Sequence, residues 1–138
     1  MLTELLREGF GKTESYNCAE RILYGANQAY GLKLNKEACK LMAGFGGGMG
    51  VEATCGALSG CVAALSCLFV SDVAHESERI RSLTRELFCR FQEKMGSADC
   101  ATLKKMHRRQ DIGCDLVVLA AAEVLDDIIC RERNVKTA

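Results

Sequence analysis

The chain has 138 residues, no proline and nine cysteines, and its 18 lysines and arginines balance 18 aspartates and glutamates. A chain of this length can bury enough apolar surface to fold without disulfide or metal staples, so we expect a single domain over residues 1–138. The zero net charge argues against a nucleic-acid-binding protein, because such proteins usually carry an excess of basic residues.

The N-terminal residues carry charges from Glu4 onward and lack the apolar core of a secretory signal. The longest apolar run, residues 57–70, is interrupted by Ser59, Gly60 and Ser66 and is shorter than the roughly 20 residues that span a bilayer. The sequence therefore predicts a cytoplasmic protein that has no membrane segment and buries this run as a helix.

The first predicted helix begins at Cys18, and its apolar residues recur at helical spacing up to Tyr30, after which Gly31 ends it. Asn35 is a typical N-cap for a second helix. The apolar positions of this second helix run to Phe45, and it stops in a glycine-rich segment.

The third predicted helix runs from about Thr54 to Val70 and is apolar on nearly every side, which is typical of a buried central helix. A fourth helix follows, with charged residues opposite an apolar stripe, and Gly96 ends it. The stripe consists of Ile80, Leu83, Leu87, Phe88, Phe91 and Met95. We expect this fourth helix to cover the central one.

Two more helices are predicted beyond this point: a short one from Asp99 to about Arg108, and a last helix with a long apolar face. That face consists of Leu116, Val117, Ala120, Ala121, Val124, Leu125, Ile128 and Ile129. The sequence therefore predicts an all-α fold: a compact bundle of about five to six helices around a central apolar helix, with a glycine-rich loop.

The nine cysteines are the anomaly of the composition. Their number is odd and no export signal precedes them, so a secreted disulfide framework is not expected. No CxxC or CxxCH spacing occurs, which argues against zinc ribbons, thioredoxin-like motifs and attached haem. If several thiols act together, the fold must bring them together.

The cysteines separate into two groups by their place in the predicted helices. Five lie within helices, mostly on or beside apolar stripes, and we expect them to be small core residues. These are Cys39, Cys61, Cys67, Cys89 and Cys130. The other four each lie in the first turn of a predicted helix, and they are Cys18, Cys55, Cys100 and Cys114.

The start of a helix favours the thiolate form of a cysteine, because unpaired N–H groups and the positive end of the dipole lie there. The effect is small: a helix end contributes about 0.3–1 kcal/mol, whereas one pKa unit needs about 1.4 kcal/mol. Four thiolates brought together would also repel one another. Such a cluster must hold a cation, stay partly protonated, or oxidise to disulfides.

Four stretches of the chain, taken in order, resemble the redox-active family named C_GCAxxG_C_C. The stretch NCAERIL carries Cys18, and GFGGGMGVEATCGALSG carries a glycine loop and the signature C-G-A-x-x-G from Cys55 to Gly60. GSADCATL carries Cys100, and GCDLVVLAAAEVL carries Cys114. The family's members are small proteins of about this length, so the resemblance covers essentially the whole chain.

This resemblance implies a redox or metal-linked role with Cys18, Cys55, Cys100 and Cys114 as the working set. The chain is also similar to the cysteine domain of split-Soret-type cytochromes, in which an iron–sulfur cluster accompanies haem. Because no haem-attachment motif is present, only a cluster is expected here, of the [2Fe–2S] type, with zinc as the alternative metal and no haem.

The glycine loop has two interpretations that are compatible with each other. The glycines expected to support the site, by letting backbone N–H groups approach sulfur, are Gly46, Gly47, Gly48, Gly50 and Gly56. Alternatively, glycines end a helix while Gly56 and Gly60 permit a tight helix crossing. A phosphate loop is disfavoured, because the segment follows a helix and lacks Gly-Lys-Ser/Thr.

Three functional hypotheses remain from the sequence. The first is an iron–sulfur protein for electron transfer or redox sensing. The second is a metal-free thiol–disulfide protein in which a pair such as Cys100 and Cys114 cycles between dithiol and disulfide. The third is a helical interaction module whose cysteines are incidental. Self-association is compatible with all three.

The remaining charged residues predict little chemistry. We expect His107 to lie at a solvated helix end, where cations complement the dipole. A neighbouring basic cluster would suit an acidic redox partner protein, although a solvated charged face is the default; it consists of Lys104, Lys105, Arg108 and Arg109. Asp126 and Asp127 have no partner in the sequence that suggests acid–base catalysis.

Overall fold

The structure is a computed structural model that describes residues 1–137. Within this range it contains seven α-helices and no strand, which confirms the predicted all-α class. The helices are α1 (Leu2–Arg7), α2 (Cys18–Tyr30), α3 (Lys36–Cys39), α4 (Gly56–Phe69), α5 (Arg79–Met95), α6 (Cys100–His107) and α7 (Asp115–Thr137). None of the described helices is both long and apolar enough to cross a lipid bilayer.

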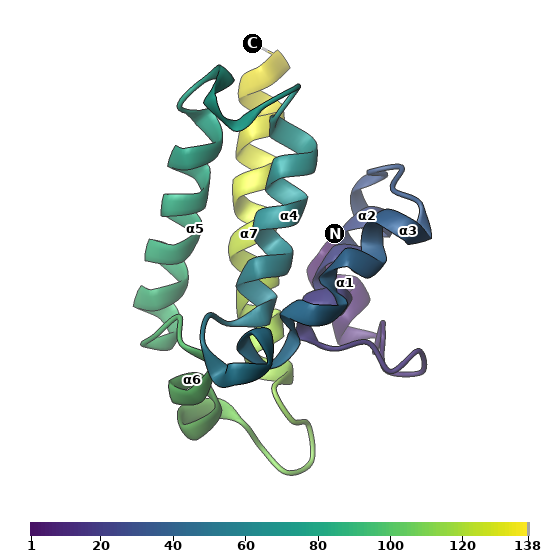
Figure 1. Cartoon of the computed structure of the whole chain (residues 1–138), viewed down its shortest axis with the longest axis vertical. Helices are drawn as coiled ribbons and strands as arrows, with labels where there is room; N and C mark the ends of the chain where they lie inside the picture. The colour runs from purple at the N-terminus through teal and green to yellow at the C-terminus, as the bar shows by residue number, and fades with distance from the viewer. Residues whose placement is uncertain (138) are drawn as a thin grey trace.

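Helices α4, α5 and α7 run side by side and form the long part of the molecule (Figure 1). Helix α2 crosses α4, and α1 packs against both α2 and α7 on that side. Helix α6 lies at the lower end in this view, below α5. The chain therefore folds as a bundle with one end at which several helices begin.

Helix α4 is the central element, as its composition predicts. It packs against α2, α5 and α7, and its side chains at Leu58, Cys61 and Leu65 are fully buried. Its start differs from the prediction, because the helix begins at Gly56 rather than near Thr54.

A glycine allows α2 and α4 to cross closely. A Cβ atom on Gly60 would lie 2.7 Å from the carbonyl oxygen of Ala19 and 2.8 Å from the Cβ of Ile22. Both distances are shorter than van der Waals contact. The crossing that the sequence suggested through Gly60 is therefore present, and a side chain there would push the helices apart.

Local end signals place most of the other helix boundaries. Asn17 forms a capping box with Glu20 at the start of α2, and Gly31 ends that helix with a φ of 62°. Gly96 ends α5 with a φ of 92°. The second predicted helix is wrong in its length: after four α-helical residues it tightens into a 3₁₀ segment, Lys40–Phe45 (η1).

Helix α1 was not predicted, and a distant carboxylate holds it in place. Asp126 is only 5% exposed. It accepts hydrogen bonds from the N–H of Leu2 at 3.2 Å and from the N–H and hydroxyl of Thr3 at 3.0 and 2.7 Å. The Tyr30 hydroxyl also donates to it. Asp126 of α7 thus satisfies two of the free N–H groups at the start of α1.

Candidate thiol redox site

The four cysteines of the signature all lie where helices begin, but two lie one position earlier than predicted. Cys18 and Cys100 are the first residues of α2 and α6. Cys55 is the N-cap of α4 rather than part of its first turn. Cys114 precedes α7, and its carbonyl accepts the N–H of Val118 at 3.0 Å.

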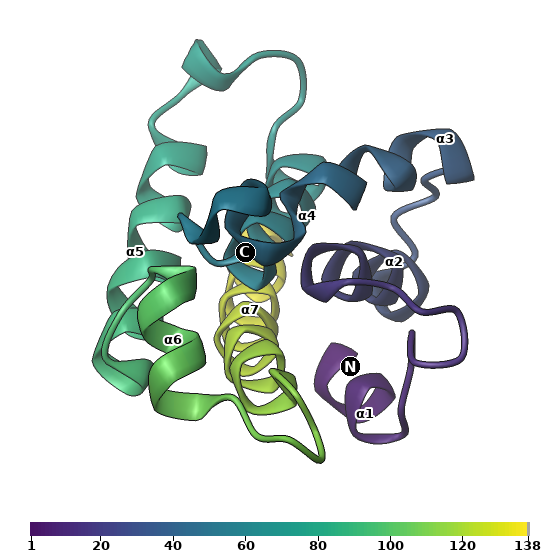
Figure 2. The same cartoon turned by 60° about the horizontal axis from the view of Figure 1, so that its bottom comes forward.

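A short backbone bridge joins the starts of α4 and α6. The N–H of Cys55 donates to the carbonyl of Ala98 at 2.9 Å, and the N–H of Cys100 donates to the carbonyl of Ala53 at 2.6 Å. The two cysteines are thereby fixed next to each other through their own backbones. Figure 2 turns this end toward the viewer, with α6 on one side of α7 and α2 on the other.

Three of the four thiols line one open cavity of about 510 Å³, and they belong to Cys18, Cys100 and Cys114. The fourth, Cys55, is 4% exposed. It lies close enough to Cys18 and Cys100 for their charges to contribute to its pKa. Within the described residues, however, no three Cys, His, Asp or Glu side chains stand in an arrangement that could hold a metal ion.

Gly56 leaves room for the sulfur of Cys18. A Cβ atom on Gly56 would lie 2.5 Å from that sulfur and 2.8 Å from the carbonyl oxygen of Phe45. Gly48 does the same for Cys100, since its Cβ would lie 2.8 Å from the Cβ of Cys100. Gly48 also has a φ of 61°, which side chains rarely adopt. Both positions need glycine because of what lies beside them.

The other three glycines named from the sequence differ in role. Gly46 lies against the side chain of Asn17, the N-cap of α2, so a Cβ there would collide with the cap. Gly47 and Gly50 have positive φ values, and a Cβ on either would meet no described atom within 4 Å. They turn the chain around the non-helical segment Gly48–Glu52 (η2). The loop thus combines sharp turns with close approaches to the cysteine-bearing segments.

Burial dominates the acidity of these thiols. Desolvation raises the pKa of Cys55 to about 11, and two backbone N–H groups at the start of α4 only partly oppose it. The pKa values of Cys100 and Cys114 are also raised by burial, against the lowering effects of Lys104 and Arg108. These three thiols are therefore protonated near neutral pH, and the helix ends do not outweigh desolvation.

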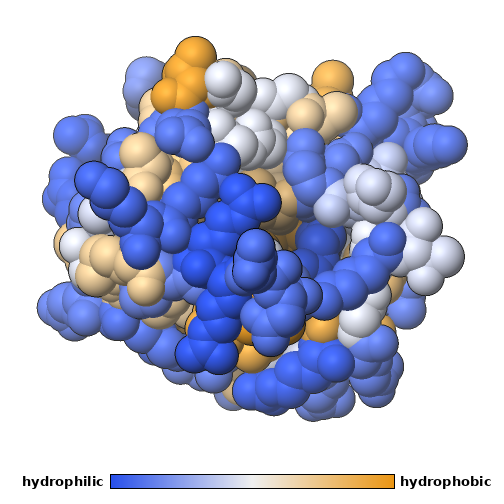
Figure 3. Space-filling view, turned by 90° about the horizontal axis from the view of Figure 1, so that it is seen from below, coloured by the Kyte–Doolittle hydropathy of each residue, from blue (hydrophilic) through white to orange (hydrophobic). Residues whose placement is uncertain are grey.

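Several cationic side chains line the cavity. Lys104 pairs with Glu52 at 2.9 Å, and Arg21 pairs with Asp115 at 2.9 Å. Arg108 also lines the cavity, and its guanidinium makes no ion pair with any described residue. Figure 3 views this end from below, and most of its surface is hydrophilic. The cavity lining thus combines these cations with the carboxylates of Asp111 and Asp115.

The cysteines outside this site do not form one class, and the prediction that all five are core residues is wrong for three. Cys39 and Cys61 are buried, whereas Cys67, Cys89 and Cys130 are exposed. The exposed three lie within helices but on the side that faces away from the buried residues of each helix, so the helical spacing itself is consistent with their exposure.

His107 is not at a solvated helix end as predicted. Its side chain is half-buried, and its Nε2 lies 2.8 Å from the carbonyl oxygen of Met95. This hydrogen bond ties the end of α6 to the end of α5, where carbonyl groups lack helical partners. His107 does not line the thiol cavity.

The fold and this end of the bundle define a small all-helical protein with a group of cysteines assembled at helix starts. The chain belongs to the family described as "Putative redox-active protein (C_GCAxxG_C_C)", which matches residues 16–128 and therefore includes Cys18, Cys55, Cys100 and Cys114. No curated protein and no solved structure matches the chain. The family places the protein among redox-active proteins and says nothing of a metal.

Proposed function

We propose that Cys18, Cys55, Cys100 and Cys114 form one redox centre that binds an iron–sulfur cluster of the [2Fe–2S] type. Its role would be electron transfer or redox sensing. The observation that carries this proposal is the shared cavity: three of these thiols line it, and the fourth lies buried beside two of them. Four cysteine thiolates are the usual ligand set of such a cluster.

The residues fit a cluster by donor chemistry and by charge. Soft thiolates suit iron–sulfur clusters and zinc, and the cations Lys104 and Arg108 would offset part of the negative charge of the bound thiolates. The described side chains as they stand do not form a closed ligand set. Binding therefore requires thiol side chains to rotate and to lose their protons, which makes it pH-dependent.

In this proposal, Cys18, Cys100 and Cys114 reach the cluster from the cavity wall and Cys55 from the buried side. The cluster would supply one-electron redox chemistry. Gly48 and Gly56 keep Cβ atoms away from Cys100 and Cys18, so the loop adds no side chain that would crowd either cysteine. Lys104 and Arg108 favour the thiolate form of Cys100 and Cys114.

Anaerobic reconstitution with iron and sulfide tests this proposal. We expect stoichiometric iron and acid-labile sulfide, with visible absorption that is lost in each of Cys18→Ser, Cys55→Ser, Cys100→Ser and Cys114→Ser. The matched control replaces the exposed Cys67, Cys89 and Cys130 with serine and should keep the cluster. A colourless protein with one bound zinc would favour a structural metal site instead, and a cluster that survives all four substitutions would refute the ligand assignment.

A second candidate function is metal-free thiol–disulfide exchange. Two observations support it: the cysteines are free thiols, and the described residues contain no closed set of metal ligands. Cys100 and Cys114 would each lose one proton and together two electrons as their sulfur–sulfur bond forms. The protons and electrons would pass to a disulfide-bearing partner, which would be reduced to two thiols. Counting free thiols by mass spectrometry, with and without reductant, distinguishes the candidates: metal-free protein with two reversibly lost thiols supports this one.

The partner in either case would be an acidic protein surface. Lys105 lies on α6, and Arg108 and Arg109 directly follow it. None of these three side chains makes an ion pair with any described residue. Such free cations speed the encounter with an acidic partner. If they do so, electron exchange with that partner should slow as ionic strength rises, and a rate independent of salt would contradict this role.

A further inference from the structure

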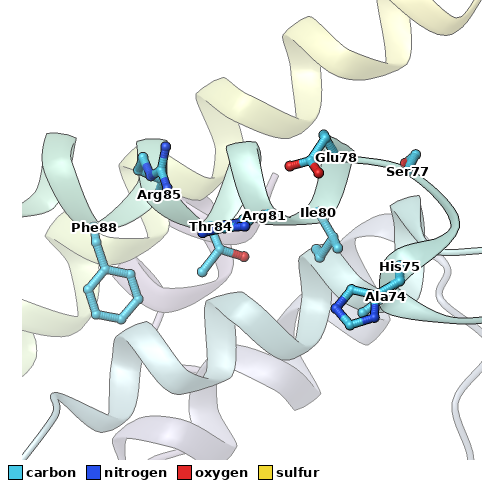
Figure 4. A pocket seen from close by; sticks show the side chains of 9 residues that line it. All are labelled: Ala74, His75, Ser77, Glu78, Ile80, Arg81, Thr84, Arg85 and Phe88. Carbon is cyan, nitrogen blue, oxygen red and sulfur yellow. The ribbon is translucent and has the colours of Figure 1, made fainter.

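A second cavity, of about 740 Å³, lies away from the cysteines and shares no lining residue with theirs. It lies between the turn of residues 71–78 and the first half of α5 (Figure 4). We propose that this groove binds an amphipathic carboxylate, with its apolar chain along α5 and its carboxylate on Arg81 and Arg85.

The floor of the groove is a stripe of three half-buried side chains, of which Ile80 and Phe88 are apolar and pack in part against the core. Ile80, Thr84 and Phe88 follow one another at four-residue spacing and leave α5 on one side. They are half-buried, whereas Leu83 and Leu87 on the neighbouring face are buried in the core. The stripe extends over about 12 Å of helix, which suits an acyl chain of medium length.

Two arginines beside this stripe have no partner among the described residues. Arg81 and Arg85 lie one turn apart and make no ion pair or hydrogen bond within that part of the chain. The other arginines of α5 differ: Arg79 pairs with Glu132, and Arg90 pairs with Glu86 and Asp127. Like charges four residues apart on a helix destabilise it slightly. A bound carboxylate would remove this repulsion and accept hydrogen bonds from both guanidinium groups.

The opposite wall is held in place before any ligand arrives. The carboxylate of Glu76 accepts the N–H groups of Ser71, Asp72 and Val73 at 2.8, 2.7 and 3.1 Å. This fixes the 3₁₀ turn Ala74–Glu76 (η3), which presents Ala74 and His75 beside Ile80. A wall that is already ordered lowers the entropic cost of binding.

The charges that face the groove favour an anion. Arg81, Arg85 and the titratable His75 line it, and Glu78 is the single carboxylate among its described lining residues. A cationic amphiphile could pair only with Glu78 and would be repelled by two arginines. An anionic head group therefore matches the groove, and an ammonium head group does not.

Isothermal titration with laurate, below its micelle concentration, tests the proposal, with dodecylammonium as a probe of equal chain length and opposite charge. We expect saturable binding of one laurate and binding of dodecylammonium that is about tenfold weaker. The variant R81Q/R85Q should bind laurate about tenfold more weakly. The control R7Q/K33Q, which removes two positive charges from sites elsewhere on the surface, should leave binding unchanged.

Three results would overturn the proposal: no saturable laurate binding, equal binding of both probes, or unchanged affinity in R81Q/R85Q. Phe88→Ser tests the apolar floor separately and should weaken laurate binding while circular dichroism shows that the helix content is kept. Sedimentation of the free protein tests whether a second copy of the chain covers the groove instead of a ligand. A dimer that Phe88→Ser dissociates would mean that a second copy covers the groove, which would also refute the proposal.

Discussion

The two ends of α4 are built on opposite principles. At its N-terminal end, Gly56 lies so close to Cys18 and to the Phe45 carbonyl that a single methyl group has no room. At its C-terminal end, the following turn is open, and the exposed carboxylate of Glu76 holds it through three backbone N–H groups. The first end requires a glycine, because neighbouring atoms fill the space of a side chain, and it tolerates little change. The second depends on one surface side chain, so its loss should remain local.

Gly56→Ala should have the largest effect on stability. The added Cβ would meet the sulfur of Cys18 and the backbone oxygen of Phe45, and the backbone oxygen cannot move away cheaply. We expect the free energy of unfolding, measured in urea, to fall by about 3 kcal/mol.

Gly44→Ala is the matched control for this substitution, because a Cβ added to Gly44 would meet no described atom within 4 Å and the φ of this residue is not positive. It should be neutral or stabilising by up to about 1 kcal/mol. If Gly56→Ala and Gly44→Ala lower the free energy of unfolding equally, the close approach at Gly56 does not explain why the N-terminal end of α4 tolerates little change.

Asp126→Asn should have the next largest effect on stability. It compares a buried carboxylate, Asp126, with the exposed carboxylate of Glu76. Like Glu76, Asp126 collects backbone N–H groups, but it is 5% exposed. An amide would turn an N–H toward donors and leave a buried group unpaired, so we expect a loss of about 2 kcal/mol in urea unfolding. The neighbouring Asp127→Asn removes only a surface ion pair with Arg90, in which the Asp127 side chain is 69% exposed. Its effect should stay below about 1 kcal/mol, and equal losses would show that burial is not decisive.

Most of the fold could be predicted because its signals are local. Asn17, Gly31 and Gly96 mark helix ends through side chains or φ values within a few residues. Helix α1 could not be predicted, since its six residues carry a weak pattern of their own. The carboxylate that holds it belongs to Asp126, at the far end of the sequence.

The candidate site could be predicted in part for the same reason. Cys18 and Cys100 follow strong N-caps, Asn17 and Asp99, so their helix positions were readable. Cys55 follows Thr54, whose backbone instead pairs with Asp99 in the bridge to α6, and this shifts the helix start. The exposure of Cys89 could have been predicted, because this residue lies on the side of α5 opposite the buried Leu87 and Phe91.

Glu76→Gln should have the smallest effect and one confined to its turn. Hydrogen bonds from the N–H groups of Ser71, Asp72 and Val73 hold the pKa of Glu76 below its ordinary value of 4.5. The carboxylate therefore stabilises the turn fully at neutral pH, and this contribution is lost as the pH falls through the lowered pKa. We expect the three amide protons to shift together in NMR spectra with a midpoint below pH 4.5.

Glu76→Gln should abolish that shared transition, whereas Glu78→Gln, which removes a neighbouring carboxylate not bonded to these amides, should retain it. Amides that shift at or above the ordinary value would show that the turn is not held by this carboxylate, and nothing would then fix the wall of the groove that Arg81 and Arg85 line.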